Sequence, residues 1–92
     1  MIVRISGEGQ WRLADGAVER VNEQDNAAVN AVSAGDEAAF NAAFAALLTA
    51  VREQGELLAD DDLSASDVIL PPADLSFAEA GEEFTGDGLI PD

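Results

Sequence analysis

The first thirteen residues, MIVRISGEGQWRL (residues 1–13), decide how this chain folds. Residues 2–5 alternate between apolar and polar side chains, as in a strand with one buried face. The loop at residues 7–10 contains two glycines, which accept positive φ at no steric cost, and residues 11–13 repeat the alternation. We therefore predict an N-terminal β-hairpin over residues 1–13. Because a two-stranded hairpin is marginal alone, helices must cover its apolar face.

Residues 16–54 have the apolar spacing of two helices joined by a short connection. Each predicted helix has a capping residue and a glycine stop: Asp15 and Gly35 for the first helix, Asp36 and Gly55 for the second. Since only three residues, 34–36, connect them, the two helices must run antiparallel. We expect a helical hairpin that packs on the β-hairpin.

Residues 56–92 are predicted to form an irregular C-terminal segment. Residues 68–70 are strand-like and are stopped by two prolines, so they form either a third, edge strand beside the hairpin or an extended segment that crosses the helices. Ser76 and Glu79 have the spacing of a capping box, which starts a short helix over 77–84. The predicted fold class is α+β, in a single domain.

The composition excludes most catalytic chemistry. The 92 residues include no cysteine, histidine, tyrosine or lysine. Without histidine, cysteine and lysine, the usual general bases, covalent nucleophiles and Schiff-base formers are missing. A hydrolase that uses a pair of carboxylates is the remaining formal option, and a domain of this size offers little room for its cleft. We expect no enzyme, no cofactor and no metal site.

The charge is strongly negative, with nineteen acidic residues against four arginines and a formal net charge of −15. Such a surface repels nucleic-acid phosphates and anionic lipid headgroups, so we expect no direct binding to either. One interpretation is a protein adapted to a salt-rich cytoplasm, whose stability falls at low salt. The other is an acidic protein that docks on basic partners as a nucleic-acid mimic. No membrane-spanning run or signal peptide is evident, and we expect a cytoplasmic protein.

Three polar residues stand out. Alternation places Arg4 and Arg12 on one face of the hairpin, where they form a cationic spot that could receive an acidic helix of a partner. The alternative is that Glu8 or other acids pair with them at the surface, which contributes little. Asp25 interrupts the apolar stripe of the first helix. It either lies in solvent, or faces the sheet and accepts hydrogen bonds from an arginine or loop amides, or contacts a partner.

Several apolar residues are further candidates for partner contact. Trp11 is expected in the core, although its indole N–H needs an acceptor. Two proline-terminated apolar segments lie outside the main helices, and they either bind a partner or fold back onto the core. Their candidate residues are Leu70 and Pro71 in the first segment and Leu89 and Ile90 in the second.

Four stretches together resemble one family. They are MIVRISGEGQWRL at residues 1–13, VNEQDNAAV at 21–29, SDVILPPADLS at 66–76 and GDGLIPD at 86–92. In this order and spacing they resemble the PspA-associated protein family, PspAA, across nearly the whole chain. One departure is Asp92, where the family more often ends Leu-Ile-Pro-Gly, and it bears on the tail alone.

The resemblance implies a single PspAA-like domain over residues 1–92 that acts as an adaptor or regulator. Its main partner would be a PspA-like protein, a coiled-coil protein that binds and remodels membranes in the phage shock envelope-stress response. The resemblance also implies that the protein comes to the inner face of the membrane through PspA. It carries no catalytic residue over to this chain, because the shared stretches read as scaffold and surface.

Overall fold

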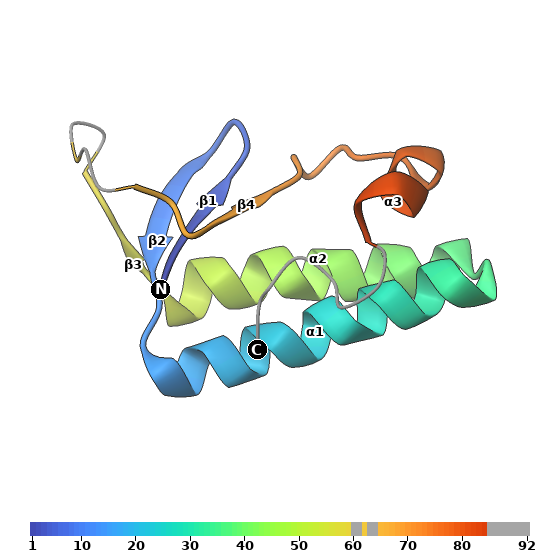
Figure 1. The fold of residues 1–92 in the computed structure, drawn as a ribbon, viewed down its shortest axis with the longest axis horizontal. Coiled ribbons are helices and arrows are strands. Elements are labelled where there is room, and N and C mark those ends of the chain that lie inside the picture. The colour runs from blue at the N-terminus through green and yellow to red at the C-terminus, as the bar shows by residue number, and fades with distance from the viewer. Residues whose placement is uncertain (60–61, 63–64, 85–92) are drawn as a thin grey trace.

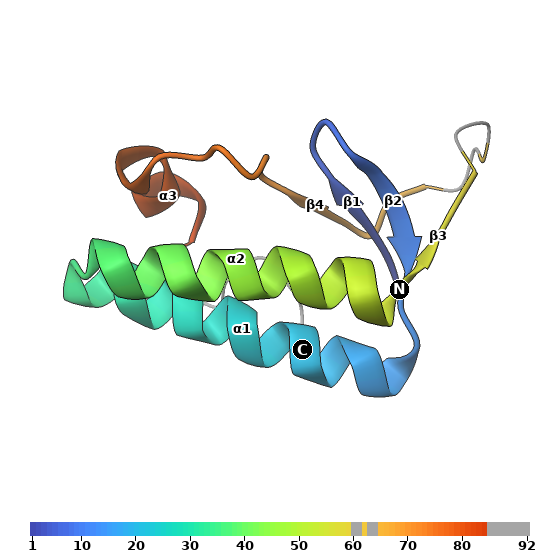
Figure 2. The same ribbon diagram turned by 180° about the vertical axis from the view of Figure 1, so that it is seen from behind.

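The computed structural model describes residues 1–59, 62 and 65–84. In chain order the elements are β1 (Ile2–Ile5), β2 (Gly9–Arg12), α1 (Asp15–Ala34), α2 (Glu37–Gln54), β3 (Glu56–Leu57), β4 (Val68–Leu70) and α3 (Phe77–Glu83). Helices α1 and α2 lie side by side as an antiparallel pair (Figure 1). The sheet packs at one end of this pair and α3 at the other, on the same side (Figure 2). The α+β prediction is confirmed.

The sheet has four strands in the order β3-β2-β1-β4. β1 pairs antiparallel with β2, with Val3 opposite Trp11, and pairs in parallel with β4, with Val3 opposite Val68. A parallel pair needs a long crossover, and the two helices lie within it. Residues 68–70 therefore form the edge strand that was one of the two expected alternatives. β3 was not predicted, because two residues are too few to show an alternating pattern.

The turn of the hairpin is tighter than expected. Glu8 N donates to Ile5 O at 2.9 Å, and Gly7 has a φ of 81°, a value that favours glycine. β2 therefore begins at Gly9, inside the stretch predicted as a loop. At the open end, Leu13 N donates to Met1 O at 2.8 Å, one residue beyond the paired strands, so the predicted N-terminal hairpin is present.

The helix ends follow the sequence signals with one exception. Gly35 caps α1 in the left-handed conformation, with a φ of 70°, and the Asp36 side chain accepts a hydrogen bond from Ala39 N at 3.0 Å. The prediction that Asp15 caps α1 is wrong. Ala14 occupies the N-cap position and Asp15 is the first helical residue, where its charge favours the helix dipole without capping.

The buried core is one cluster, to which strands β1, β2 and β4 and the helices α1, α2 and α3 all contribute. At the sheet end, Trp11 and Leu13 lie beside Gly55, just after the end of α2. At the other end, all four phenylalanines of the chain meet, and their ring centroids lie 5.4 to 5.8 Å apart. The residues of this phenylalanine cluster are Phe40, Phe44, Phe77 and Phe84.

Candidate partner-binding surface

The face of the sheet that points away from the core carries two of the four arginines. Arg4 lies opposite Gln10, and Arg12 lies opposite Ile2, so the two arginines are diagonal neighbours on the same face. Both are exposed. Six residues form this outer sheet face: Ile2, Arg4, Gln10, Arg12, Glu56 and Ile69.

The outer sheet face has mixed charge. Among the described residues, no carboxylate oxygen lies within 4.0 Å of Arg4 or Arg12, although Glu56 lies opposite Arg12 in the strand register. The Arg4 Nε donates to Ser66 Oγ at 3.4 Å, and Ser66 Oγ donates to Gln10 Oε1 at 2.5 Å. Gln10 is buried beneath this contact. Neither guanidinium group therefore forms an ion pair with a described carboxylate.

The Glu8 carboxylate pairs with an arginine that is distant in the sequence. Its Oε1 and Oε2 accept hydrogen bonds from Arg52 Nε and Nη2 at 2.8 and 2.6 Å, a bidentate arrangement. This pair joins the turn of the hairpin to the last turn of α2. The hydrogen bond from Arg52 lowers the pKa of Glu8, and in turn the hydrogen bond to Glu8 raises the pKa of Arg52.

Asp25 lies in the protein interior. Its exposed fraction is 0%, and it is one of the two polar or charged residues buried among the described residues. It also takes part in an interaction, so the alternative that places it in solvent does not describe the structure. A direct contact between Asp25 and a partner would first require the surrounding side chains to open.

Of the other predicted contact residues, three are buried, in the core or beside β4, and two lie outside the described residues. Trp11 and Leu70 are buried in the core, with exposed fractions of 7% and 0%. Pro71 is buried and lines the groove described below. Leu89 and Ile90 lie outside the described residues.

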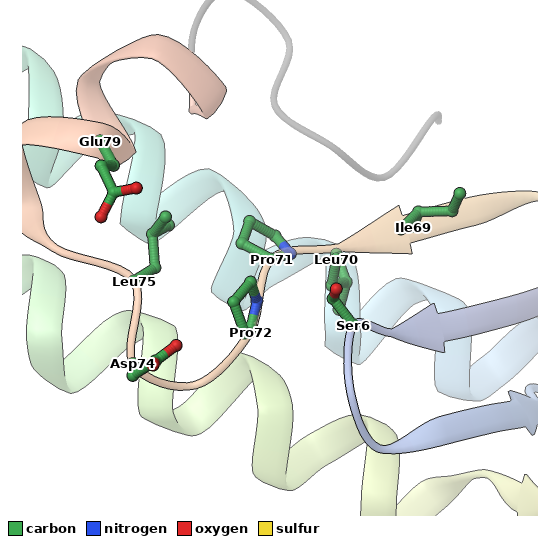
Figure 3. Close-up of a pocket in the computed structure, with 8 residues that line it drawn as sticks. All are labelled: Ser6, Ile69, Leu70, Pro71, Pro72, Asp74, Leu75 and Glu79. Carbon is green, nitrogen blue, oxygen red and sulfur yellow. The ribbon is translucent and has the colours of Figure 1, made fainter.

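A groove of about 450 Å³ lies between the end of β4 and the start of α3. In Figure 3, Ser6 and Ile69 lie at one end, and Asp74, Leu75 and Glu79 lie at the other. Pro71 and Pro72 lie between these ends, and Leu70 joins the wall. We call this concave surface the edge groove, because β4 is an edge strand.

Only part of the edge groove could be predicted from the sequence. Leu70 and Pro71 were predicted as contact residues, whereas Ile69, which is 64% exposed, was not. The strand-like run 68–70 indicated a strand, but nothing in it showed which side chain would remain in solvent. The position of the strand at the sheet edge depends on its pairing with β1, a partner distant in the sequence.

No group of three or more histidine, cysteine, aspartate or glutamate side chains in the described ranges could hold a metal ion. None of the helices α1 to α3 has an apolar stretch of the length that crosses a bilayer.

Comparison with known proteins and protein families identifies the family of the chain. No curated protein matches the chain, and no solved structure matches it. The model of a protein family described as PspA-Associated protein, PspAA, matches residues 1–92. The match covers every stretch on which the sequence resemblance rested, and the chain therefore belongs to the PspAA family.

Proposed function

We propose that the protein is a non-enzymatic adaptor or regulator that associates with a PspA-like protein in the response to envelope or membrane stress. The observation that carries this proposal is the family match over residues 1–92, because the family is described as PspA-associated. In this role the protein would be cytoplasmic and would reach the inner face of the membrane through its partner.

The chemistry of the chain supports a binding role over a catalytic one. With no histidine, cysteine or lysine, proton transfer and covalent catalysis would depend on carboxylates, hydroxyls and arginines. The molecule does offer exposed features that suit protein contact. These are the outer sheet face, with Arg4 and Arg12, and the edge groove, with Ile69.

A pull-down from lysate of the source organism tests the proposal. The tagged protein is used as bait at physiological and at molar potassium chloride, and bound proteins are identified by mass spectrometry. We expect a PspA-like protein at both salt concentrations, since an apolar contact survives screening. The unrelated control bait should be an acidic protein of similar size and net charge.

The opposite outcome would favour the acidic mimic. The net charge of −15 attracts basic proteins without any specific surface, and such binding weakens steeply as salt rises. Recovery of basic proteins at low salt alone, with no PspA-like protein at either salt, would overturn the adaptor proposal.

A further inference from the structure

We propose that the edge groove receives a short extended segment of a partner protein that carries basic and apolar side chains in alternation. The segment adds to the free edge of β4, places an apolar side chain against Ile69, and brings a basic side chain to Asp74 and Glu79. The proposal relies on the proposed function only for the identity of the partner.

The backbone of β4 is open on one side. Leu70 O accepts a hydrogen bond from Ser6 N at 3.0 Å, so the backbone groups of Leu70 face β1. Successive residues of a strand present their N–H and C=O groups to opposite edges, so those of Ile69 face away from β1. β4 is the last strand of the sheet formed by the described residues. Ile69 thus offers one donor and one acceptor to an added strand.

Apolar side chains line the edge groove from one end to the other. Ile69 is 64% exposed, although isoleucine is among the residues most often buried. Leu75 is half-buried and Pro71 is buried, and both line the same groove. A partner side chain seated here would remove Ile69 from water, which is favourable by roughly 25 cal/mol for each Å² of apolar surface.

The far end of the groove is acidic. Asp74 and Glu79 are both exposed, and no arginine of the described residues lies within 4.0 Å of either carboxylate. Glu79 Oε1 accepts hydrogen bonds from Ser76, which leaves its second oxygen for a partner. A guanidinium or ammonium group that reached either carboxylate would form charge-assisted hydrogen bonds with it.

The charges also argue against a second copy of this chain as the occupant. A second copy brings another net charge of −15 and the same acidic groove. Like charges brought together at an interface oppose association and suppress wrong partners. A basic segment of a different protein meets no such repulsion.

The prolines limit the length of the added strand. Pro71 and Pro72 have no N–H group, so the ladder cannot continue beyond Leu70. A short, proline-terminated edge also protects against uncontrolled strand pairing. Affinity in the groove would therefore depend on the side chains at both ends as well as on the backbone, which makes docking selective for sequence.

A peptide titration tests the groove directly. The probe is a synthetic pentapeptide of alternating arginine and valine, added to the isotope-labelled full chain and followed by nuclear magnetic resonance. We expect the largest amide shifts at Ile69, Leu70 and Leu75. An N-methylated version, which keeps the charges but loses backbone donors, should bind more weakly, and a glutamate-valine version should not bind. Shifts spread over the acids of α1 and α2, or equal binding of the N-methylated peptide, would overturn the proposal.

A matched pair of triple variants tests the same surface with the PspA-like protein of the source organism. The groove variant combines Ile69→Ala, Asp74→Asn and Glu79→Gln, and glutamine keeps the capping box of α3. The control combines Leu57→Ala, Glu23→Gln and Glu53→Gln, with the same change of charge. Leu57 is 63% exposed, so it matches Ile69, and it lies on the opposite edge strand.

The expected result is a loss of affinity of about tenfold or more in the groove variant, at molar salt, and a change within about twofold in the control. Circular dichroism of both variants checks that they remain folded. Equal losses of affinity in the two variants would overturn the proposal that the edge groove binds the partner. If the unmodified chain does not bind the PspA-like protein, the proposed function fails. The peptide titration still decides whether the edge groove binds a basic extended segment.

Discussion

The two ends of the helical hairpin are covered in different ways. At the sheet end, backbone hydrogen bonds join four strands, and Trp11 and Leu13 pack beneath them. At the other end α3, which has seven residues, is held through the rings of the phenylalanine cluster. A ladder fixes the register of its strands, whereas ring packing depends on a few side chains. The difference suggests that single substitutions should damage the α3 end most.

The largest effect is expected from Phe40→Ala. Phe40 has no exposed surface and contacts the three other phenylalanine rings. Its truncation should lower the free energy of unfolding by about 3–5 kcal/mol, from lost apolar burial and the cavity left behind. Since small domains have only about 5–15 kcal/mol in total, denaturant titration should show an early transition.

Phe77→Ala is the control for this prediction. Phe77 is half-buried, and its ring contacts only Phe40 among the ring pairs of the described residues. Phe77→Ala should therefore lower the free energy of unfolding by clearly less than Phe40→Ala does. If the two truncations have equal effects, the α3 end does not depend on a central ring.

At the sheet end, Gly55→Ala should lower the stability of the fold, because an added Cβ atom would meet neighbouring atoms. A Cβ atom at this position would lie 2.7 Å from Val51 O and 2.8 Å from Trp11 Cβ, so the strand and helix must separate. We expect a loss of about 1–3 kcal/mol, the usual cost of overpacking. Thermal unfolding measures it.

Gly81→Ala is the matched substitution at the α3 end. Apart from its chain neighbours and the backbone of α3, no atom of the described residues lies within 4 Å of the added Cβ, and alanine favours a helix over glycine by about 1 kcal/mol. Gly81→Ala should therefore stabilise α3. No effect of Gly55→Ala would contradict the close contact at the sheet end, and destabilisation by Gly81→Ala would contradict the open space around Gly81.

Features set by neighbouring residues could be predicted from the sequence. Gly35, Asp36 and the capping box at Ser76 each involve hydrogen bonds within about five residues, and all three were found. The end of the second helix at Gly55 was also predicted, but the reason why this position requires glycine was not. Its φ of −89° needs no glycine, and the requirement comes from contact with the strand at Trp11.

Features that join distant segments could not be predicted. Glu8 pairs with Arg52, 44 residues away, whereas sequence analysis considered only the nearby arginines. The edge groove likewise needs Ser6 at the end of β1 to lie beside residues 69–79. β3 is paired through only two residues, so its existence depends on β2 being next to it. Periodicity and spacing carry no information on these contacts.

Ser76→Ala tests whether α3 can open separately from the sheet end. Ser76 Oγ accepts a hydrogen bond from Glu79 N at 3.2 Å, and Glu79 in turn reaches the backbone of Ser76. The loss of this capping box should cost about 1 kcal/mol. We expect amide hydrogen exchange to speed up in α3 with little change in β1 and β2. Asp36→Ala, which removes the cap of α2, is the control, and uniform acceleration in the Ser76 variant would contradict separate opening.

Glu8→Gln has the smallest expected effect on stability, and it tests the ion pair that joins the hairpin turn to α2. The side chains of Glu8 and Arg52 are 31% and 38% exposed, so the ion pair should contribute only about 0.2–1 kcal/mol, and less in molar salt. Because folding lowers the pKa of Glu8, this contribution is present above the unfolded pKa and is lost as the pH falls through the folded value. Any neutralised acid also relieves repulsion in this chain, so Glu53→Gln is the reference. The difference in unfolding free energy between the two variants should disappear in acid and shrink as potassium chloride is added. A difference that persists under both conditions would mean that Glu8 stabilises the protein through something other than its charge.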